Sequence, residues 1–174
     1  MTERAPFQTL KDYGDFELRR YPTLMQIETT VQGDFLSAGN LGFRPLVSFI
    51  SGFNKSGQKI AMTAPVIQEP LAANKHLVRF VLPSDLSKEK VPEAADGSVK
   101  VIEVREHLSA VRRFSGSWNQ ERFQEEGQKL LAGVKKAGLA AEGNLYWSRF
   151  DPPWKPGFLK HNEVAVKISE VTTS

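Results

Sequence analysis

Hydrophobic residues alternate with polar residues in two separate parts of the chain, near the N-terminus and near the middle. In the first part, Phe16 and Leu18 are followed by an alternating series at positions 25, 27, 29 and 31. In the second part, Val99 and Val101 precede the same pattern in residues 108–114. A period of two is typical of strands with one buried face, so each part predicts two strands.

The first pair of strands is followed by a helical pattern, whose apolar residues fall at i, i+3, i+4 and i+7: Phe43, Leu46, Val47 and Ile50. Asp34 is a suitable N-cap before this pattern, and Gly52 is a suitable stop after it. Pro45 lies inside the pattern, where its ring removes a backbone donor and crowds the preceding turn. We therefore expect a helix that is kinked, or divided in two, at Pro45.

A second helical pattern follows the later strands, and its apolar face consists of Phe123, Leu130, Leu131 and Val134. Ser117 and Gln120 have the spacing of a capping box, which predicts that the helix begins just after Ser117. Gly138 supplies its end. After each helix the chain returns to strand patterns, which cover residues 59–66, 77–82, 145–150 and 163–168.

Both halves of the chain therefore have the same order of elements: strand, strand, helix, strand, strand. This repeat of pattern indicates a structural duplication. An isolated half would leave its apolar faces exposed, so we expect an α+β fold in which an antiparallel, distorted barrel-like sheet carries both helices. Residues 83–97, rich in Pro, Ser, Ala and charge, are expected to form a surface crossover within one domain of residues 1–174.

Composition narrows the classes of function. The chain has no cysteine, which excludes disulfides, thiolate metal sites and thioether-attached cofactors. Its net charge of +3 comes from 23 basic and 20 acidic residues without a basic block, so we do not expect nucleic acid as a partner. No apolar run reaches the roughly 18 residues of a membrane span, and no signal peptide is evident. We expect a soluble protein, cytoplasmic by default.

Motifs of common enzyme classes are absent from the sequence. GxSxG, HExxH, the phosphate-binding glycine loop and the dinucleotide fingerprint do not occur. We therefore assign no catalytic residue and favour a binding protein over an enzyme. A small hydrolase that uses carboxylates distant in sequence, such as Glu17, Glu103 or Glu163, is kept as a minor alternative.

Four stretches carry a family resemblance: FELRRYP at 16–22, GFRPLVSFISG at 42–52, QKIAMTAPV at 58–66 and FDPPWKPGFLKHNEVAV at 150–166. Together they resemble the SOUL heme-binding family, in the same order and spacing over nearly the whole chain. The resemblance implies a distorted barrel of antiparallel strands with two helices in pseudo-twofold arrangement. This architecture is also similar to the effector-binding domains of bacterial drug-sensing regulators.

The resemblance implies non-covalent binding of heme or another tetrapyrrole in a groove between the first helix and the loop before the last strand. By position, Phe43 and Val47 would form the apolar wall on the helix, with Phe150 opposite them. Arg44 and Lys155 would meet the ligand's carboxylates. Met62, in the third stretch, is added to this cofactor-binding set. Phe43, Val47 and Met62 have an alternative interpretation as plain core residues.

One position departs from the family pattern. The axial histidine proposed for a family member would lie directly before Tyr21, where this chain has Arg20, and a protonated guanidinium does not ligate iron. We assign no metal ligand. The remaining candidates are His76, His107, His161, Met25, Met62, Tyr21 and Tyr146, and the three histidines are expected at the surface.

The leading hypothesis is therefore a heme or porphyrin carrier or buffer. The alternative is a generic binder or sensor of flat hydrophobic molecules without heme function. The sequence leaves the oligomeric state, the physiological ligand and the iron ligation open.

Overall fold

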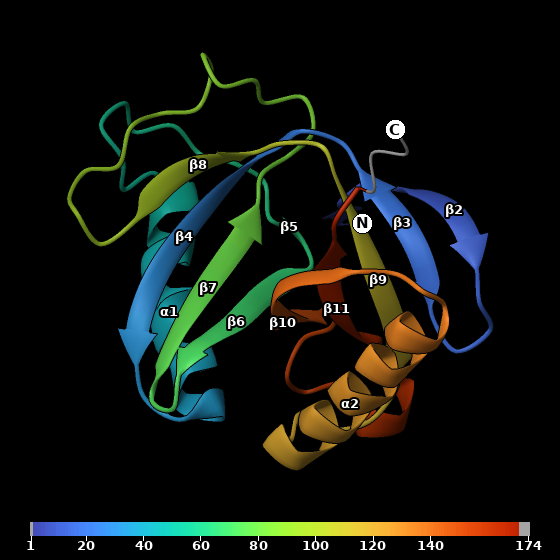
Figure 1. The fold of residues 1–174 in the computed structure, drawn as a ribbon. Helices are drawn as coiled ribbons and strands as arrows, with labels where there is room; N and C mark the ends of the chain where they lie inside the picture. The colour runs from blue at the N-terminus through green and yellow to red at the C-terminus, as the bar shows by residue number, and fades with distance from the viewer. Residues whose placement is uncertain (1, 171–174) are drawn as a thin grey trace. The chain divides into compact units, whose positions relative to one another are not determined.

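A computed structural model describes residues 2–170, which form two compact units that interleave along the sequence (Figure 1). The first unit contains the chain up to Pro6 together with Thr23–Arg105. The second contains Phe7–Pro22 and the chain from Glu106 onward. The expectation of one domain over residues 1–174 stays a prediction.

The first unit is an antiparallel sheet with a helix packed on one face. Its described strands follow the order β6-β7-β4-β8, with the bounds Val66–Ala72, Lys75–Val81, Leu24–Gln32 and Lys100–Val104. Helix α1 (Phe35–Ile50) lies behind β4 and β7 in the view of Figure 1. A short parallel pair joins β1 (Glu3–Arg4) to β5 (Thr63–Ala64).

Local chemistry explains where α1 begins and ends. The carboxylate of Asp34 accepts a hydrogen bond from the backbone N–H of Ser37 at 2.8 Å, which confirms the predicted N-cap. Gly52 follows the helix with φ of 117°, a conformation that glycine adopts without strain. The helix runs through Pro45 as one element, so the alternative of a helix in two pieces is wrong, and the alternative of a kink at Pro45 stays a prediction. The carbonyl that loses its donor belongs to the exposed Leu41, where water can bind it.

The core of the first unit lies between α1 and the sheet. Its buried members come from alternate positions of the strands and from one side of the helix: Met25, Ile27, Val78, Phe80, Leu46, Phe49 and Ile50. This alternation is the pattern that the sequence displays at residues 25–31. The predicted helix face is divided, because Leu46 and Ile50 are buried whereas Phe43 is exposed.

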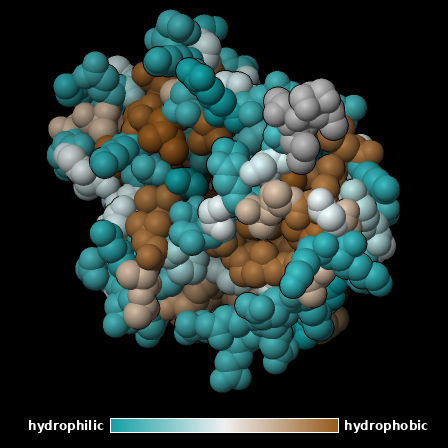
Figure 2. Space-filling model, in the orientation of Figure 1, coloured by the Kyte–Doolittle hydropathy of each residue, from teal (hydrophilic) through white to brown (hydrophobic). Residues whose placement is uncertain are grey.

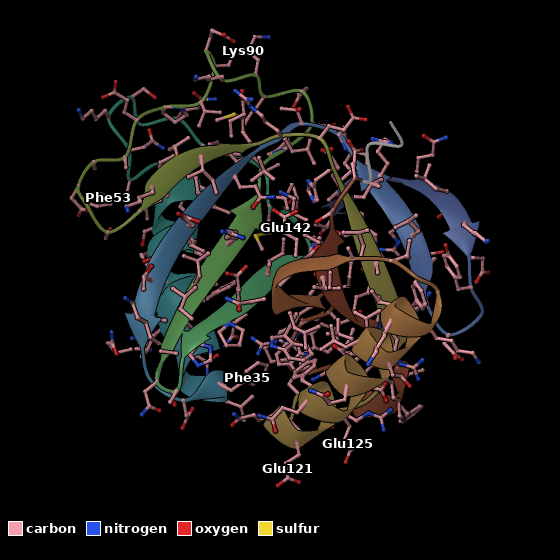
Figure 3. The ribbon with its side chains drawn as sticks, viewed as in Figure 1. Phe35, Phe53, Lys90, Glu121, Glu125 and Glu142 are labelled. Carbon is pink, nitrogen blue, oxygen red and sulfur yellow. The ribbon has the colours of Figure 1, made fainter. Side chains whose placement is uncertain are left out.

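The second unit repeats the arrangement. Its strands follow the order β2-β3-β9-β11-β10, with the bounds Gln8–Asp12, Glu17–Tyr21, His107–Phe114, Asn162–Ile168 and Ala141–Arg149. Helix α2 (Gln120–Lys136) packs on β9, β10 and β11 through Phe123, Leu130 and Val134. Glu121 and Glu125 lie on the side of α2 that faces away from this sheet and point into solvent (Figure 3). A short 3-10 turn, η1 (Gly157–Leu159), precedes β11.

The start of α2 differs from the prediction. Asn119, and not Ser117, accepts the capping hydrogen bond, at 3.2 Å from the backbone N–H of Arg122. Ser117 lies against Gly157 instead. The end agrees with the prediction, because Gly138 follows the helix with φ of 74°.

The two units are related by a duplication in which the first strands are exchanged. Each half of the sequence has the predicted order, with β3, β4, α1, β6 and β7 matched by β8, β9, α2, β10 and β11. However, β3 pairs with β9 in the second unit, and β8 pairs with β4 in the first. The α+β class, the antiparallel strands and the duplicated pattern are confirmed; the exchange was not predicted.

One predicted strand is placed too early. Residues 59–62 form no strand, and pairing in the main sheet begins at Val66, after Pro65. The backbone N–H of Ile60 bonds instead to the carbonyl of Ile50 at 2.8 Å, which ties this segment to the end of α1. The apolar side chain of Ile60 enters the core from this loop. In the sequence, this buried apolar residue therefore looked like part of a strand.

Candidate functional site

An apolar stripe runs along α1, and it consists of the exposed Leu36 and Phe43 and the half-buried Val47. Spacings of seven and four residues place these side chains above one another on the helix. Phe43 is 42% exposed, and its ring lies edge-on to the buried ring of Phe80, with centroids 5.3 Å apart. This contact fixes one edge of the ring and leaves the remainder available for a ligand.

Two further predicted residues lie in the same unit. Arg44 is exposed and follows Phe43 on the helix. Met62 is half-buried and, like Val47, packs against the core of the first unit. The core interpretation of Met62 therefore has direct support, whereas Phe43 and Arg44 have the accessibility that a ligand contact requires.

The other two predicted residues lie in the second unit, in the loop between β10 and β11. The ring of Phe150 stacks on His161 with centroids 4.2 Å apart. The ammonium of Lys155 donates to Asp151 at 2.7 Å, and the second carboxylate oxygen of Asp151 accepts the backbone N–H of His161 at 2.5 Å. Burial opposes ionisation of Asp151, but these two hydrogen bonds outweigh it and lower the pKa of the carboxyl. Lys155 thus has an internal counter-ion.

The same loop exposes aromatic residues that the sequence analysis did not select. Trp154 is 82% exposed, and Phe158 is nearly as accessible. The face seen in Figure 2 is mostly hydrophilic, with several hydrophobic patches among the polar residues. The loop is held in place, because Gly116 donates its N–H to the carbonyl of Gly157 at 2.9 Å. Large apolar side chains inside a Pro- and Gly-rich segment were the signal available in the sequence.

A buried ion-pair network crosses the sheet of the second unit. Arg19 donates two hydrogen bonds to the carboxylate of Glu163, at 2.8 and 3.1 Å, and Glu163 is only 3% exposed. The Nε2 atom of His161 lies 2.8 Å from the same carboxylate. Burial alone would raise the pKa of Glu163, but the hydrogen bonds from His161 and Arg19 lower it.

The polar groups of this network already bond to one another. Arg19 also donates to Glu17 at 2.5 Å and to the hydroxyl of Tyr21 at 3.0 Å. Both oxygens of Glu163 are already bonded. A carboxylic acid that acts as a general acid near neutral pH needs a raised pKa, and Glu163 has a lowered one. The minor alternative of a hydrolase gains no support from this residue.

The histidines and Arg20 bear on iron ligation. Arg20 forms surface ion pairs with Glu170 at 2.8 Å and with Glu106 at 3.5 Å. The expectation of a surface histidine is wrong for His76, which is 3% exposed and lies 3.2 Å from the side-chain amide of Gln68. Among the described residues, no group of three His, Cys, Asp or Glu side chains could hold a metal ion. An axial ligand remains unassigned.

The paired sheet-and-helix units define an α+β fold that other proteins share. The C-terminal domain of EcmrR superposes with a TM-score of 0.67 at 14% identity, covering 95% of this chain and 99% of that domain. A hydrolase from Listeria innocua gives a TM-score of 0.59 at 10% identity, covering 87% and 91% of the two chains. Within residues 2–170, no helix is long and apolar enough to cross a membrane.

Sequence comparison identifies the family. The family model described as SOUL heme-binding protein matches residues 2–167, and the chain belongs to this family. Heme-binding protein 2 of Homo sapiens is 26% identical over 152 residues, which cover 83% of this chain and 74% of the relative. Heme-binding protein 2 of Mus musculus is 27% identical over the same shares. The family resemblance of the four sequence stretches is confirmed.

Proposed function

We propose that this protein binds heme or a related tetrapyrrole non-covalently and acts as a carrier or buffer for it. The observation that carries the proposal is the exposed apolar stripe of α1, where Phe43 stands against Phe80 with much of its ring accessible. Membership of the SOUL family supports the same ligand class. The stripe would take the apolar face of the macrocycle, and the exposed Arg44 beside it would meet a carboxylate.

The side chains present fit the macrocycle better than they fit its iron. A tetrapyrrole offers a large flat apolar surface, which aromatic and aliphatic side chains recognise. When bound, heme would supply a redox-active iron. The rings of His76, His107 and His161 already contact Gln68, Tyr21 and Phe150, respectively. We therefore propose that macrocycle contacts carry the binding, and contacts from Phe150 and Lys155 stay predictions.

The proposal is tested by truncating the stripe. We expect Phe43→Ala to weaken hemin binding by about ten-fold, because roughly 1–2 kcal/mol of apolar and aromatic contact is lost. Absorbance titration with hemin, and in parallel with metal-free protoporphyrin, measures the affinities. The two ligands are expected to bind wild type similarly, since no axial bond is invoked.

Leu41→Ala is the matched control, because Leu41 is also exposed on α1 but lies on a different side of the helix. Its affinity should equal that of wild type. If hemin gives only a broad, unsaturable band with wild type, heme binding does not extend to this member. Equal losses in both variants would instead indicate non-specific adsorption to exposed apolar residues.

A generic hydrophobic ligand is the second candidate. The same stripe favours it, because apolar contact alone does not select iron or a porphyrin ring. Competition between protoporphyrin and a flat, uncharged dye separates the two functions. Displacement of protoporphyrin at equal concentration of the dye would favour the generic binder.

A further inference from the structure

The loop between β10 and β11 exposes three large apolar side chains within residues 154–159. Trp154 is 82% exposed, Phe158 is 78% exposed and Leu159 is 54% exposed. Trp154 and Phe158 are the most accessible large hydrophobic side chains among the described residues. Contact between apolar surface and water is unfavourable, and a group of such side chains commonly marks a surface that another molecule covers.

The backbone of this loop is held in a defined conformation. The N–H of Gly116 donates to the carbonyl of Gly157 at 2.9 Å. A Cβ atom at Gly157 would lie 2.5 Å from the Oγ atom of Ser117, so the turn packs tightly against the segment before α2. Prolines at positions 152, 153 and 156 restrict φ further. A partner that covers the loop therefore has little backbone freedom to remove, which favours docking.

The part of the second unit around the loop is positively charged. The bond from Gly116 to Gly157 joins residues 112–129 to residues 149–160. Together these segments carry seven basic and four acidic side chains, an excess equal to the net charge of +3 of the whole chain. The chain as a whole is almost balanced, with 23 basic and 20 acidic residues, so positive charge is concentrated around the exposed loop.

One carboxylate in these segments is shared among three cations. Glu126 is only 2% exposed, and its oxygens lie 2.6 Å from Arg112, 3.5 Å from Arg122 and 3.4 Å from Lys129. A single negative charge neutralises this group only in part. The side chain of Arg122 is 43% exposed and donates to the carbonyl of Ser115 at 3.3 Å, which places it beside the turn that contacts Gly157. Part of the excess charge is therefore accessible next to the loop.

The extent of the apolar surface distinguishes between kinds of partner. A large aromatic side chain buries about 150–250 Å², so the three side chains together offer roughly 400–500 Å². A stable protein interface buries about 800 Å² on each partner. The loop is therefore too small to hold a second copy or another protein by itself. A lipid surface needs no complementary shape, and tryptophan is favoured where lipid headgroups meet hydrocarbon.

We propose that this loop docks the protein on the surface of an anionic membrane. Trp154, Phe158 and Leu159 enter the headgroup region, and the surrounding basic side chains face the negative charges of the lipids. This docking is peripheral and needs no membrane-spanning helix. It goes beyond the proposed heme binding and does not depend on it.

Vesicle sedimentation with the intact protein tests the docking. The probes are vesicles of phosphatidylcholine alone and vesicles of equal parts phosphatidylcholine and phosphatidylserine. We expect saturable binding to the mixed vesicles and weaker binding to phosphatidylcholine alone. Added salt should release the protein, because it screens the attraction between the basic residues and the anionic lipid. Failure to bind the mixed vesicles, or equal binding to both kinds, overturns the proposal.

Phe158→Ala removes one of the proposed lipid contacts. It should weaken binding to the mixed vesicles by about ten-fold, because one apolar ring no longer enters the membrane. Phe53→Ala is the matched control, since Phe53 is 60% exposed on a loop of the first unit (Figure 3). Its binding should equal that of wild type. Equal losses in the two variants would mean that exposed rings adsorb to lipid without a defined site, contrary to the proposal.

Tryptophan fluorescence locates the loop in the bilayer. Brominated lipid quenches a tryptophan that enters the membrane, and we expect quenching in wild type that is largely lost in Trp154→Phe. Quenching that persists in this variant would place another of the three tryptophans in the membrane and overturn the proposal.

Sedimentation velocity without lipid tests the competing occupant, a second copy of the chain. We expect a monomer in wild type and in Phe158→Ala. A wild-type dimer that Phe158→Ala dissociates would identify the loop as an interface between copies and refute membrane docking.

Discussion

Arg19 and Glu163 form the most deeply buried ion pair described in the second unit. Both side chains are almost inaccessible, and their two parallel hydrogen bonds give the strong geometry of a guanidinium–carboxylate pair. A buried charge is costly unless it is paired, so each residue depends on the other. At the residue scale, stability should therefore be sensitive to this pair.

Replacing Glu163 tests that dependence. We expect Glu163→Gln to lower the free energy of unfolding by about 3 kcal/mol, because Arg19 remains buried with part of its charge uncompensated. Urea denaturation measures the change. Glu170→Gln, which removes an exposed partner of Arg20, is the matched control and should cost less than about 1 kcal/mol. Equal effects of the two substitutions would mean that Arg19 finds compensation elsewhere.

Acid should weaken the same pair. The pKa of Glu163 is lower in the folded chain than the ordinary value of 4.5. Its contribution to stability is therefore complete above that value and is lost as the pH falls through the lowered folded pKa. Unfolding free energies measured from neutral pH to about pH 3 should fall less steeply in Glu163→Gln than in wild type. Identical slopes would assign acid sensitivity to other carboxyls.

At the scale of the element, α1 combines a close approach to the sheet with an exposed apolar stripe. The helix comes close to the sheet at Gly42, because a Cβ atom there would lie 2.5 Å from the side chain of Val78. This contact holds the helix close to β7, and Phe43, the next residue along the helix, remains partly exposed beside it. The position of the proposed ligand surface thus depends on a residue that does not touch a ligand.

Gly42→Ala tests this packing. Although alanine favours helix formation, we expect a net loss of about 1–3 kcal/mol in unfolding free energy, because Val78 or the helix must move. Ser48→Ala, on the exposed side of the same helix, is the control and should change stability by less than about 0.5 kcal/mol. Thermal and urea unfolding provide the measurement, and a stabilised Gly42→Ala variant would refute the close contact.

At the scale of the whole molecule, the exchanged strands make each unit depend on both halves of the sequence. Strand β3 comes from the first half and completes the sheet of the second unit, while β8 comes from the second half and pairs with β4. Arg19 lies on β3 and Glu163 on β11, so the buried ion pair also joins the two halves of the chain. The stability of each unit therefore depends on a strand from the other half of the sequence.

Splitting the chain after Ala95 tests the exchange. Residues 1–95 then lack β8, and residues 96–174 lack β3. We expect neither fragment to unfold cooperatively alone, because each leaves a strand edge and apolar surface uncovered, whereas an equimolar mixture should recover the circular dichroism of the intact chain. Independent cooperative folding of both fragments would show that the exchanged strands are dispensable.

The sequence determined the class of both helices and of the strands that flank them, the cap at Asp34, the stop at Gly138, the duplicated order and the family. These features depend on local periodicity and on residues close in the chain. Only the tertiary structure decided which sheet receives β3 and β8, since an alternating pattern specifies a buried face but not a partner. It also placed Phe43 at the surface and Ile50 in the core. The tertiary structure also placed Lys155 next to Asp151, and Lys160 near Arg149. Ion pairing depends on distances in space, which the order of the residues does not specify.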